Sequence, residues 1–258
     1  MIKYPMNSLG EIILQTMKEM TLFQAFFLFL IENLLILGFS VWIGNLLVRK
    51  FQDRRISPKP FRIEFQEILW ASSTLLLNTA VTVAGLYLWR YGLITFRNDL
   101  GPMVLFDTLV LFMAMDASMY FLHRIAHISW IYPLAHKTHH RYENPRPLTL
   151  FVLNPFEALG FGILWLSVIS LYDSSWIGMS IYLVLNVVFG TLGHLGVEPF
   201  PDSWLRLPIF RFLTTSTFHA RHHQFPDSNF GFYTSIWDIC FGTLYFGYEQ
   251  SFGKLPET

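Results

Sequence analysis

Three long runs of apolar residues fill the first half of the chain, from Thr21 to Ile43, from about Ile68 to Trp89 and from about Met103 to Leu122. Each is long enough to cross the roughly 30 Å hydrocarbon layer of a bilayer as a helix. Residues 1–20, in contrast, mix apolar positions with four charged ones. That pattern predicts an amphipathic helix at the membrane surface.

Two shorter apolar runs follow, Phe156 to Tyr172 and Trp176 to Gly193, and only three residues separate them. So short a connection predicts a helical hairpin. At 17 and 18 residues, each run is near the lower limit for a full span, so the hairpin either crosses completely or only dips into the bilayer. From Val197 onward no long apolar run occurs. This last part is expected to form a water-facing or interfacial cap.

Composition leads to the same class of protein. Hydrophobic residues make up 53% of the 258 and charged residues only 14%, far from a soluble average. We therefore expect an all-α integral membrane helical bundle, with about four to five membrane helices if the hairpin is counted, and a cap. A net charge of zero gives no electrostatic reason to expect nucleic acid as a partner. The single cysteine, Cys240, excludes an internal disulfide framework.

Histidine is the residue type with the strongest pattern. All nine lie in one stretch: His123, His127, His136, His139, His140, His194, His219, His222 and His223. They form one HxxxH pair, two HxxHH triplets and a single residue. Positions three and four apart share a helix face, so the pair can address one point and each triplet can offer two or three ring nitrogens to another.

Nine imidazoles exceed the needs of one ion, because imidazole is the commonest protein metal ligand and a tetrahedral zinc takes about four ligands. The pattern predicts two metal ions, or one metal site with an extensive histidine surround. For His194 alone, a role as an ordinary satisfied polar residue is equally open.

Asp116 falls on the same helical stripe as Tyr120, His123 and His127. It is a candidate for ordering the metal site or relaying protons. The alternative, a satisfied buried carboxylate, is equally open. Seven residues of helix, about 10 Å, argue against direct contact between Asp116 and His123.

The basic residues predict the sidedness of the membrane protein, because short loops rich in Lys and Arg stay cytoplasmic. If the loop of residues 44–66 is cytoplasmic, 14 of the 18 Lys and Arg residues lie on that side. The same topology puts every histidine group on the cytoplasmic face, makes the histidine-rich cap cytoplasmic and leaves the N-terminus outside.

Several motifs together resemble those of a known family. The histidine order is accompanied by Arg124 after His123, by Asn229-Phe230-Gly231 after the second triplet, and by Trp237-Asp238 and Phe241-Gly242-Thr243. The combination resembles the fatty acid hydroxylase and sterol desaturase superfamily of membrane di-iron oxygenases. The resemblance covers about residues 103–245, and Phe230 stands where the family more usually has Tyr. It predicts a catalytic domain over 103–245, preceded by a two-span segment over 1–102 and followed by a tail over 246–258.

The resemblance implies a reaction and a set of partners. It implies hydroxylation or desaturation of a membrane lipid with dioxygen as co-substrate, two iron ions as cofactor, and electrons from a separate donor of the cytochrome b5, ferredoxin or reductase type. Zinc can replace the iron in purified samples under the usual affinity order. Eight histidines would be ligands with His194 as a ninth, supported by Asn229, Asp238 and the candidate Asp116. The membrane would be a bacterial inner membrane, or the endoplasmic reticulum in a eukaryote.

Other functions also fit a histidine-rich membrane protein. A metal transporter would need ionisable residues in mid-membrane on several helices, a membrane cytochrome would need paired histidines on facing spans, and a non-oxidative metal-dependent lipid hydrolase of the common type would carry an HExxH motif. The histidines instead cluster at one face, the HxxHH triplets do not lie on facing spans, and no HExxH occurs. The motifs do not choose among lipids, or between hydroxylation and desaturation.

Overall fold

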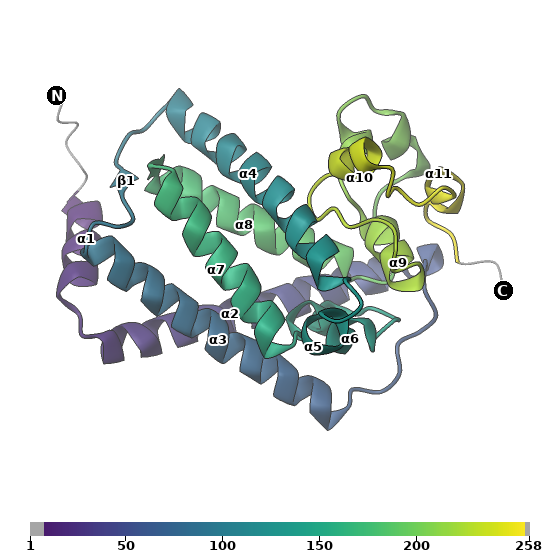
Figure 1. The fold of residues 1–258 in the computed structure, drawn as a ribbon, viewed down its shortest axis with the longest axis horizontal. Helices are drawn as coiled ribbons and strands as arrows, with labels where there is room; N and C mark the ends of the chain where they lie inside the picture. The colour runs from purple at the N-terminus through teal and green to yellow at the C-terminus, as the bar shows by residue number, and fades with distance from the viewer. Residues whose placement is uncertain (1–7, 256–258) are drawn as a thin grey trace.

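The computed structural model describes residues 8–255, which are mostly helical (Figure 1). The range 1–20, expected to be helical, contains α1, Ser8–Glu19, and residues 1–7 lie outside the described part. So do residues 256–258 of the expected tail. No membrane-length strand occurs in the described range, so the all-α prediction is confirmed.

Four helices are long and apolar enough to cross a membrane: α2, Leu22–Lys50; α3, Phe65–Arg90; α4, Pro102–Ala126; and α8, Trp176–Gly193. The partner of α8 in the hairpin, α7, Pro155–Leu171, is slightly shorter. The remaining elements are short: η1, Gln52–Arg54; β1, Phe96–Arg97; α5, Tyr132–Ala135; α6, Lys137–His140; η2, Pro147–Phe151; β2, Ser174–Ser175; η3, Asp202–Arg206; η4, Phe210–Phe212; α9, Ser216–Gln224; α10, Ile236–Phe241; and α11, Tyr248–Ser251.

The ends of the long helices follow from local sequence. Thr21 begins α2 with a capping box, in which its hydroxyl accepts from the Gln24 N–H at 3.2 Å and the Gln24 side chain accepts from the Thr21 N–H at 2.8 Å. The same helix continues seven residues beyond the apolar run that ended at Ile43. Arg49 and Lys50 occupy its last turn, where cations stabilise the negative end of a helix.

The bundle is held together by packing of α4 against both arms of the α7–α8 hairpin, with α3 beside α7 and α2 beside α3 and α8. Leu111 and Met115 of α4 lie in its core with Tyr182 of α8. On the outer surfaces, many large apolar side chains are exposed, as expected for helices that face lipid. The histidine-bearing elements α5, α6 and α9 gather at the other end of the bundle from β1 (Figure 1).

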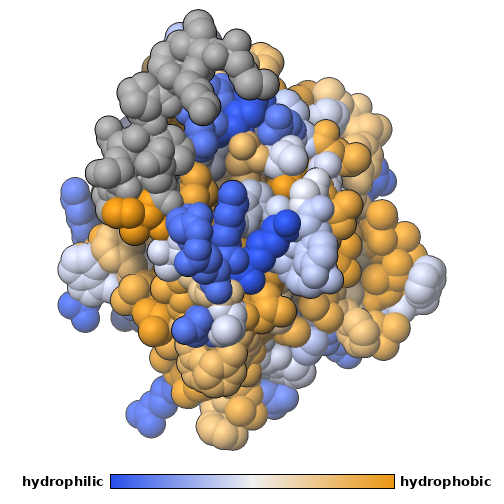
Figure 2. Space-filling view, turned by 90° about the vertical axis from the view of Figure 1, so that its left-hand side faces the viewer, coloured by the Kyte–Doolittle hydropathy of each residue, from blue (hydrophilic) through white to orange (hydrophobic). Residues whose placement is uncertain are grey.

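The tip of the hairpin is fixed to the linker between α3 and α4. Phe96 pairs with Ser174, and Arg97 with Ser175, as two short parallel strands. The tip of the hairpin therefore lies at the end of the bundle where α4 begins, although α7 and α8, with 17 and 18 residues, are shorter than α4 with 25. Figure 2 shows this end face, where hydrophilic residues are bordered by hydrophobic ones.

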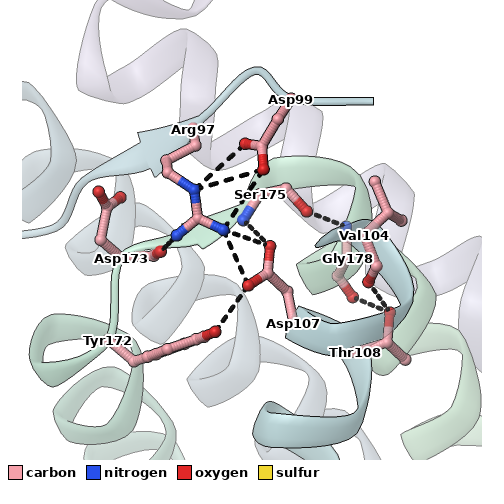
Figure 3. Close-up of polar contacts among 9 residues, drawn as sticks. All are labelled: Arg97, Asp99, Val104, Asp107, Thr108, Tyr172, Asp173, Ser175 and Gly178. Carbon is pink, nitrogen blue, oxygen red and sulfur yellow. Dashed lines mark hydrogen bonds and ion pairs between the residues drawn. The ribbon is translucent and has the colours of Figure 1, made fainter. Parts of the chain in front are cut away.

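A buried polar cluster, which we call the clasp, reinforces this junction and consists of Arg97, Asp107, Tyr172 and Ser175 (Figure 3). Asp107 is fully buried. Its oxygens accept from Arg97 Nη2 at 2.7 and 2.9 Å, from the Tyr172 hydroxyl at 2.6 Å and from the Ser175 N–H at 2.8 Å. Close approach of α4 and α8 here requires Gly178, because a Cβ at that position would lie 2.9 Å from the Cβ of Asp107.

Candidate metal centre

Four separate parts of the chain deliver the histidines to one place. The last turn of α4 carries His123, and His127 follows its end. His136 lies between α5 and α6, and α6 carries His139 and His140. His194 follows the end of α8, and α9 carries the second triplet. Because α4 and α8 end on the same side of the bundle, their terminal histidines meet those of the short helices. The structure therefore brings together all nine histidines that the sequence singles out.

The nine histidines divide into two groups. Within each group, the candidate ligand atoms lie within 4.8 Å of one another. The five-histidine group consists of His123, His127, His136, His140 and His222. The four-histidine group consists of His139, His194, His219 and His223. Each HxxHH triplet is thus split: His139 leaves the first triplet for the four-histidine group, and His222 leaves the second for the five-histidine group. The helical spacing predicted that two or three histidines of each triplet can face one metal site. Which two do so is decided by tertiary packing.

Four of the six nitrogen separations in the four-histidine group are close to those expected around a single metal ion. The Nε2 atoms of His194 and His219 are 3.1 Å apart, as are those of His219 and His223. Those of His139 and His223 are 3.2 Å apart, and those of His139 and His194 are 3.5 Å apart. Four nitrogens placed 2.0–2.1 Å from a tetrahedral ion would lie about 3.3 Å from one another. The residues present therefore fit a metal ion.

Hydrogen bonds on the outer ring nitrogens fix which nitrogen faces inward. His123 Nδ1 donates to the Phe230 carbonyl at 2.9 Å, and His222 Nδ1 donates to the Ser228 carbonyl at 2.7 Å. In the other group, His194 Nδ1 donates to the Gly190 carbonyl at 2.7 Å. A neutral imidazole that donates through Nδ1 has a lone pair on Nε2. This is the arrangement that second-shell acceptors give to metal-binding histidines.

The inward nitrogens then face one another without a proton to share. His123 Nε2 and His136 Nε2 are 3.0 Å apart, yet His123 donates through Nδ1 to a backbone carbonyl and, with Glu157 ionised, His136 also donates through Nδ1. Two lone pairs at this distance repel unless a cation lies between or beside them. His127 Nε2 is also buried and has no hydrogen-bond partner among residues 8–255. Both observations fit an ion in the five-histidine group.

Burial keeps these imidazoles neutral. It lowers the pKa of His127 to about 2, of His140 to about 3 and of His194 to about 4. Burial, followed by the neighbouring histidines, lowers the pKa of His136, His139, His219, His222 and His223 well below the ordinary value. Neutral imidazole is the form that binds metal, so at neutral pH no proton competes for these nitrogens.

Glu157 is a site residue that the sequence reasoning missed. It lies in the first turn of α7 and is 7% exposed. Its Oε1 accepts from His136 Nδ1 at 2.6 Å, and its Oε2 has no partner among the described residues. A signal was available, because Glu157 is the only charged residue in the apolar run from Phe156 to Tyr172.

The predicted supporting carboxylates lie behind the histidines. Asp238 accepts from the N–H groups of Phe230 and Gly231, both at 2.8 Å, and so holds the carbonyl to which His123 donates. Asp116 accepts from the N–H groups of Tyr233 and Thr234 at 3.0 and 2.9 Å. It contacts no histidine in the described part of the chain, so its contacts fit the satisfied buried carboxylate better than a proton relay.

Asn229 fixes the turn before Phe230. Its φ of 58° is in the left-handed region, which Asn tolerates better than most residues. Its side chain donates to the Phe218 carbonyl at 3.0 Å and accepts from the Tyr245 N–H at 2.8 Å. Asn229 therefore connects the start of α9 to the segment that covers the histidines.

Comparisons with known proteins identify a family for this chain. The family model for fatty acid hydroxylase matches residues 108–243, more than half of the chain. Human lathosterol oxidase is 26% identical over 192 residues, covering 69% of this chain and 60% of its own length. Methylsterol monooxygenase 2-2 of Arabidopsis thaliana is 32% identical over 136 residues, which are 51% of this chain and 50% of the relative.

A third relative is the very-long-chain aldehyde decarbonylase GL1-1 of Oryza sativa subsp. indica. It is 30% identical over 138 residues, which are 51% of this chain but only 22% of the relative. The matches thus span from about a fifth to three fifths of the length of these relatives. No solved structure matches the chain.

Proposed function

The chain belongs to the fatty acid hydroxylase family, and on that premise we propose that it is a membrane-bound di-iron oxygenase that hydroxylates or desaturates a lipid. The observation that carries the proposal is the pair of converging histidine groups at the ends of apolar helices. Imidazole alone suits zinc, copper and nickel as well as iron. Iron follows from the family, and bound iron with dioxygen supplies the oxidant that attack on an unactivated C–H bond requires.

The residues that would hold the two ions are the five-histidine and four-histidine groups as defined above. The rest of the site orients them. Phe230 is 5% exposed, and its ring lies 5.3 Å from that of His127 and 5.6 Å from those of His123 and His222. It therefore excludes water from one side of the five-histidine group. Glu157 and the Phe230 and Ser228 carbonyls hold ring nitrogens in the orientation that binding needs.

The substrate would be a lipid whose tail stays in the bilayer. The named relatives act on sterols or very-long-chain aldehydes, which are apolar molecules of that kind. Lifting a tail of ten CH₂ groups into water would cost roughly 8 kcal/mol at about 0.8 kcal/mol each. We therefore infer entry sideways from the membrane. Electrons would come from a separate redox protein.

We place the histidine end on the cytoplasmic face because the basic residues gather on that side. Single cysteines introduced at Arg55 and Arg141, in a Cys240→Ser background, should react with a membrane-impermeant maleimide only after the membrane is opened. A cysteine introduced at Asn98 should react in intact cells or spheroplasts. The reverse labelling pattern would invert the topology.

The test of the reaction is a comparison of lipid extracts from a knockout and its parent by mass spectrometry. A lipid present only in the parent should differ from its precursor by about +16 mass units for hydroxylation or −2 for desaturation. Iron added back to the purified, metal-free protein, together with a source of electrons, should restore the conversion in the presence of dioxygen. Conversion that proceeds equally without dioxygen would refute the oxygenase and favour a hydrolase.

A further inference from the structure

Large apolar side chains are exposed on a part of the cap that the sequence left as water-facing or interfacial. Ile209 is 76% exposed and Phe210 44%, at η4, while Ile239 and Phe241 are each 48% exposed on α10. The two elements are joined, because the Ser235 N–H donates to the Phe212 carbonyl at 2.8 Å and Leu213 pairs with Thr234. We call residues 207–212 and 236–241 the apolar edge. Exposed apolar surface of this kind marks contact with a partner or a membrane.

The apolar edge is continuous with the lipid-facing side of α4. Phe121 of α4 is 44% exposed, and its ring lies 5.5 Å from that of Phe241 and 6.2 Å from that of Trp237. Farther inside, Trp237 Nε1 donates to Asp116 at 3.1 Å. Since α4 ends at Ala126, Phe121 lies about 7 Å and Asp116 about 15 Å before its end at 1.5 Å per residue. Figure 1 shows α10 beside the second half of α4, as these contacts require.

Charge along the edge has the distribution expected at a membrane interface. Arg206 and Arg211 are exposed and flank Ile209 and Phe210, and the guanidinium of Arg211 lies 5.3 Å from the centre of the Phe212 ring. Long basic side chains commonly cover apolar surface with their stems while the charge reaches the head groups. If only water surrounded the edge, the same apolar side chains would remain exposed to solvent.

We propose that the apolar edge, η4 and α10, is inserted in the membrane leaflet that surrounds the C-terminal end of α4. Its partner is the boundary between the head groups and acyl chains of a lipid bilayer. The inference rests on the membrane-spanning bundle and does not depend on which reaction the histidines catalyse. It makes this part of the cap a monotopic anchor in addition to the spans.

Because Cys240 is the only cysteine, a Cys240→Ser background permits a direct test. Ile239→Cys places a thiol on the apolar edge, and Gln250→Cys places one on an exposed position of α11 as the matched control. Both proteins are labelled with bimane and reconstituted in phosphatidylcholine vesicles that contain lipids brominated near the top of the acyl chains. Bimane at 239 should be quenched by the brominated lipid, and bimane at 250 should not.

A second readout uses the unlabelled thiols in the same vesicles. The thiol at 239 should react with a membrane-impermeant maleimide at least about tenfold more slowly than the thiol at 250, and the two rates should become equal in SDS. Slow reaction without quenching would mean that protein rather than lipid covers the edge, and would overturn the proposal. Equal rates in vesicles with no quenching at 239 would overturn it as well.

Discussion

At the end of the bundle that carries β1 and β2, the buried Asp107 carboxylate meets a guanidinium, a hydroxyl and a backbone N–H, all donors. At the other end, equally buried imidazoles turn acceptor nitrogens toward one another, as His123 and His136 do at 3.0 Å. Polar groups are buried at both ends, but only at the β1 end do hydrogen-bond donors meet acceptors. A buried polar group whose partners are all protein is explained by the fold, whereas a cluster of like acceptors needs something the chain does not supply.

This comparison predicts that changes at the histidine end remove metal and activity, whereas changes at the clasp lower stability alone. The largest effect is expected from the ligands. His139→Ala removes a nitrogen from the four-histidine group, and His222→Ala removes one from the five-histidine group. Each should abolish activity and reduce the metal content of the purified protein from two equivalents toward one.

Membrane insertion should be unchanged in both variants, because the spans insert by hydrophobicity. Lys137→Ala, an exposed position in the same short helix as His139, is the matched control and should keep both metal equivalents. Activity close to wild type in either histidine variant would remove that residue from the site.

The next largest effect is expected at Glu157. Glu157→Gln keeps an oxygen that can accept from His136 Nδ1 but removes the charge that strengthens the bond. Loss of such an outer partner typically costs 10–100-fold in metal affinity or activity. We expect a loss of that size on metal titration, confined to one of two binding steps. Glu143→Gln, an exposed change nearby, should leave both steps unaltered, and an equal effect of the two variants would contradict the role assigned to Glu157.

Features set by residues close together in the sequence could be predicted from the sequence alone, whereas contacts between distant elements could not. The apolar run from about Trp176 to Gly193 predicted α8, which has these bounds, because an apolar run between polar residues is a local signal. The gathering of the histidines was predictable from their common sidedness. The exchange of His139 and His222 between groups was not, because it depends on how α6 and α9 pack. Glu157 was missed for the same reason, since its partner His136 lies on a different element.

The clasp shows the same limit. Arg97 and Asp107 were separate charges in the sequence, one in a linker and one near the start of an apolar run. Packing of α4 against the tip of the hairpin brings Tyr172 and Ser175 to the Asp107 carboxylate, and pairing of β1 with β2 places Arg97 beside it. Pairing between residues more than 60 positions apart leaves no periodic trace.

A smaller effect, on stability only, is expected from Asp107→Asn. The amide group would direct a donor toward Arg97, Tyr172 or Ser175, all of which donate to the carboxylate now. Leaving a buried donor unsatisfied costs about 1–3 kcal/mol. Unfolding followed in detergent should show a loss of that size, while the folded protein keeps two equivalents of metal. Metal loss like that of the histidine variants would break the distinction between the two ends.

The smallest effect is expected from Asp99→Asn, which changes the other carboxylate of the same arginine. Arg97 Nε lies 3.2 Å from Asp99 Oδ1, but the Asp99 side chain is 27% exposed whereas that of Asp107 is fully buried. Water can solvate both the introduced amide and the Arg97 guanidinium after the change, so the loss should stay below about 1 kcal/mol, as for exposed ion pairs. Added salt should reduce it further by screening, while the loss from Asp107→Asn should hardly respond. Equal losses at the two positions, or equal salt dependence, would show that burial of Asp107 does not set the strength of the clasp.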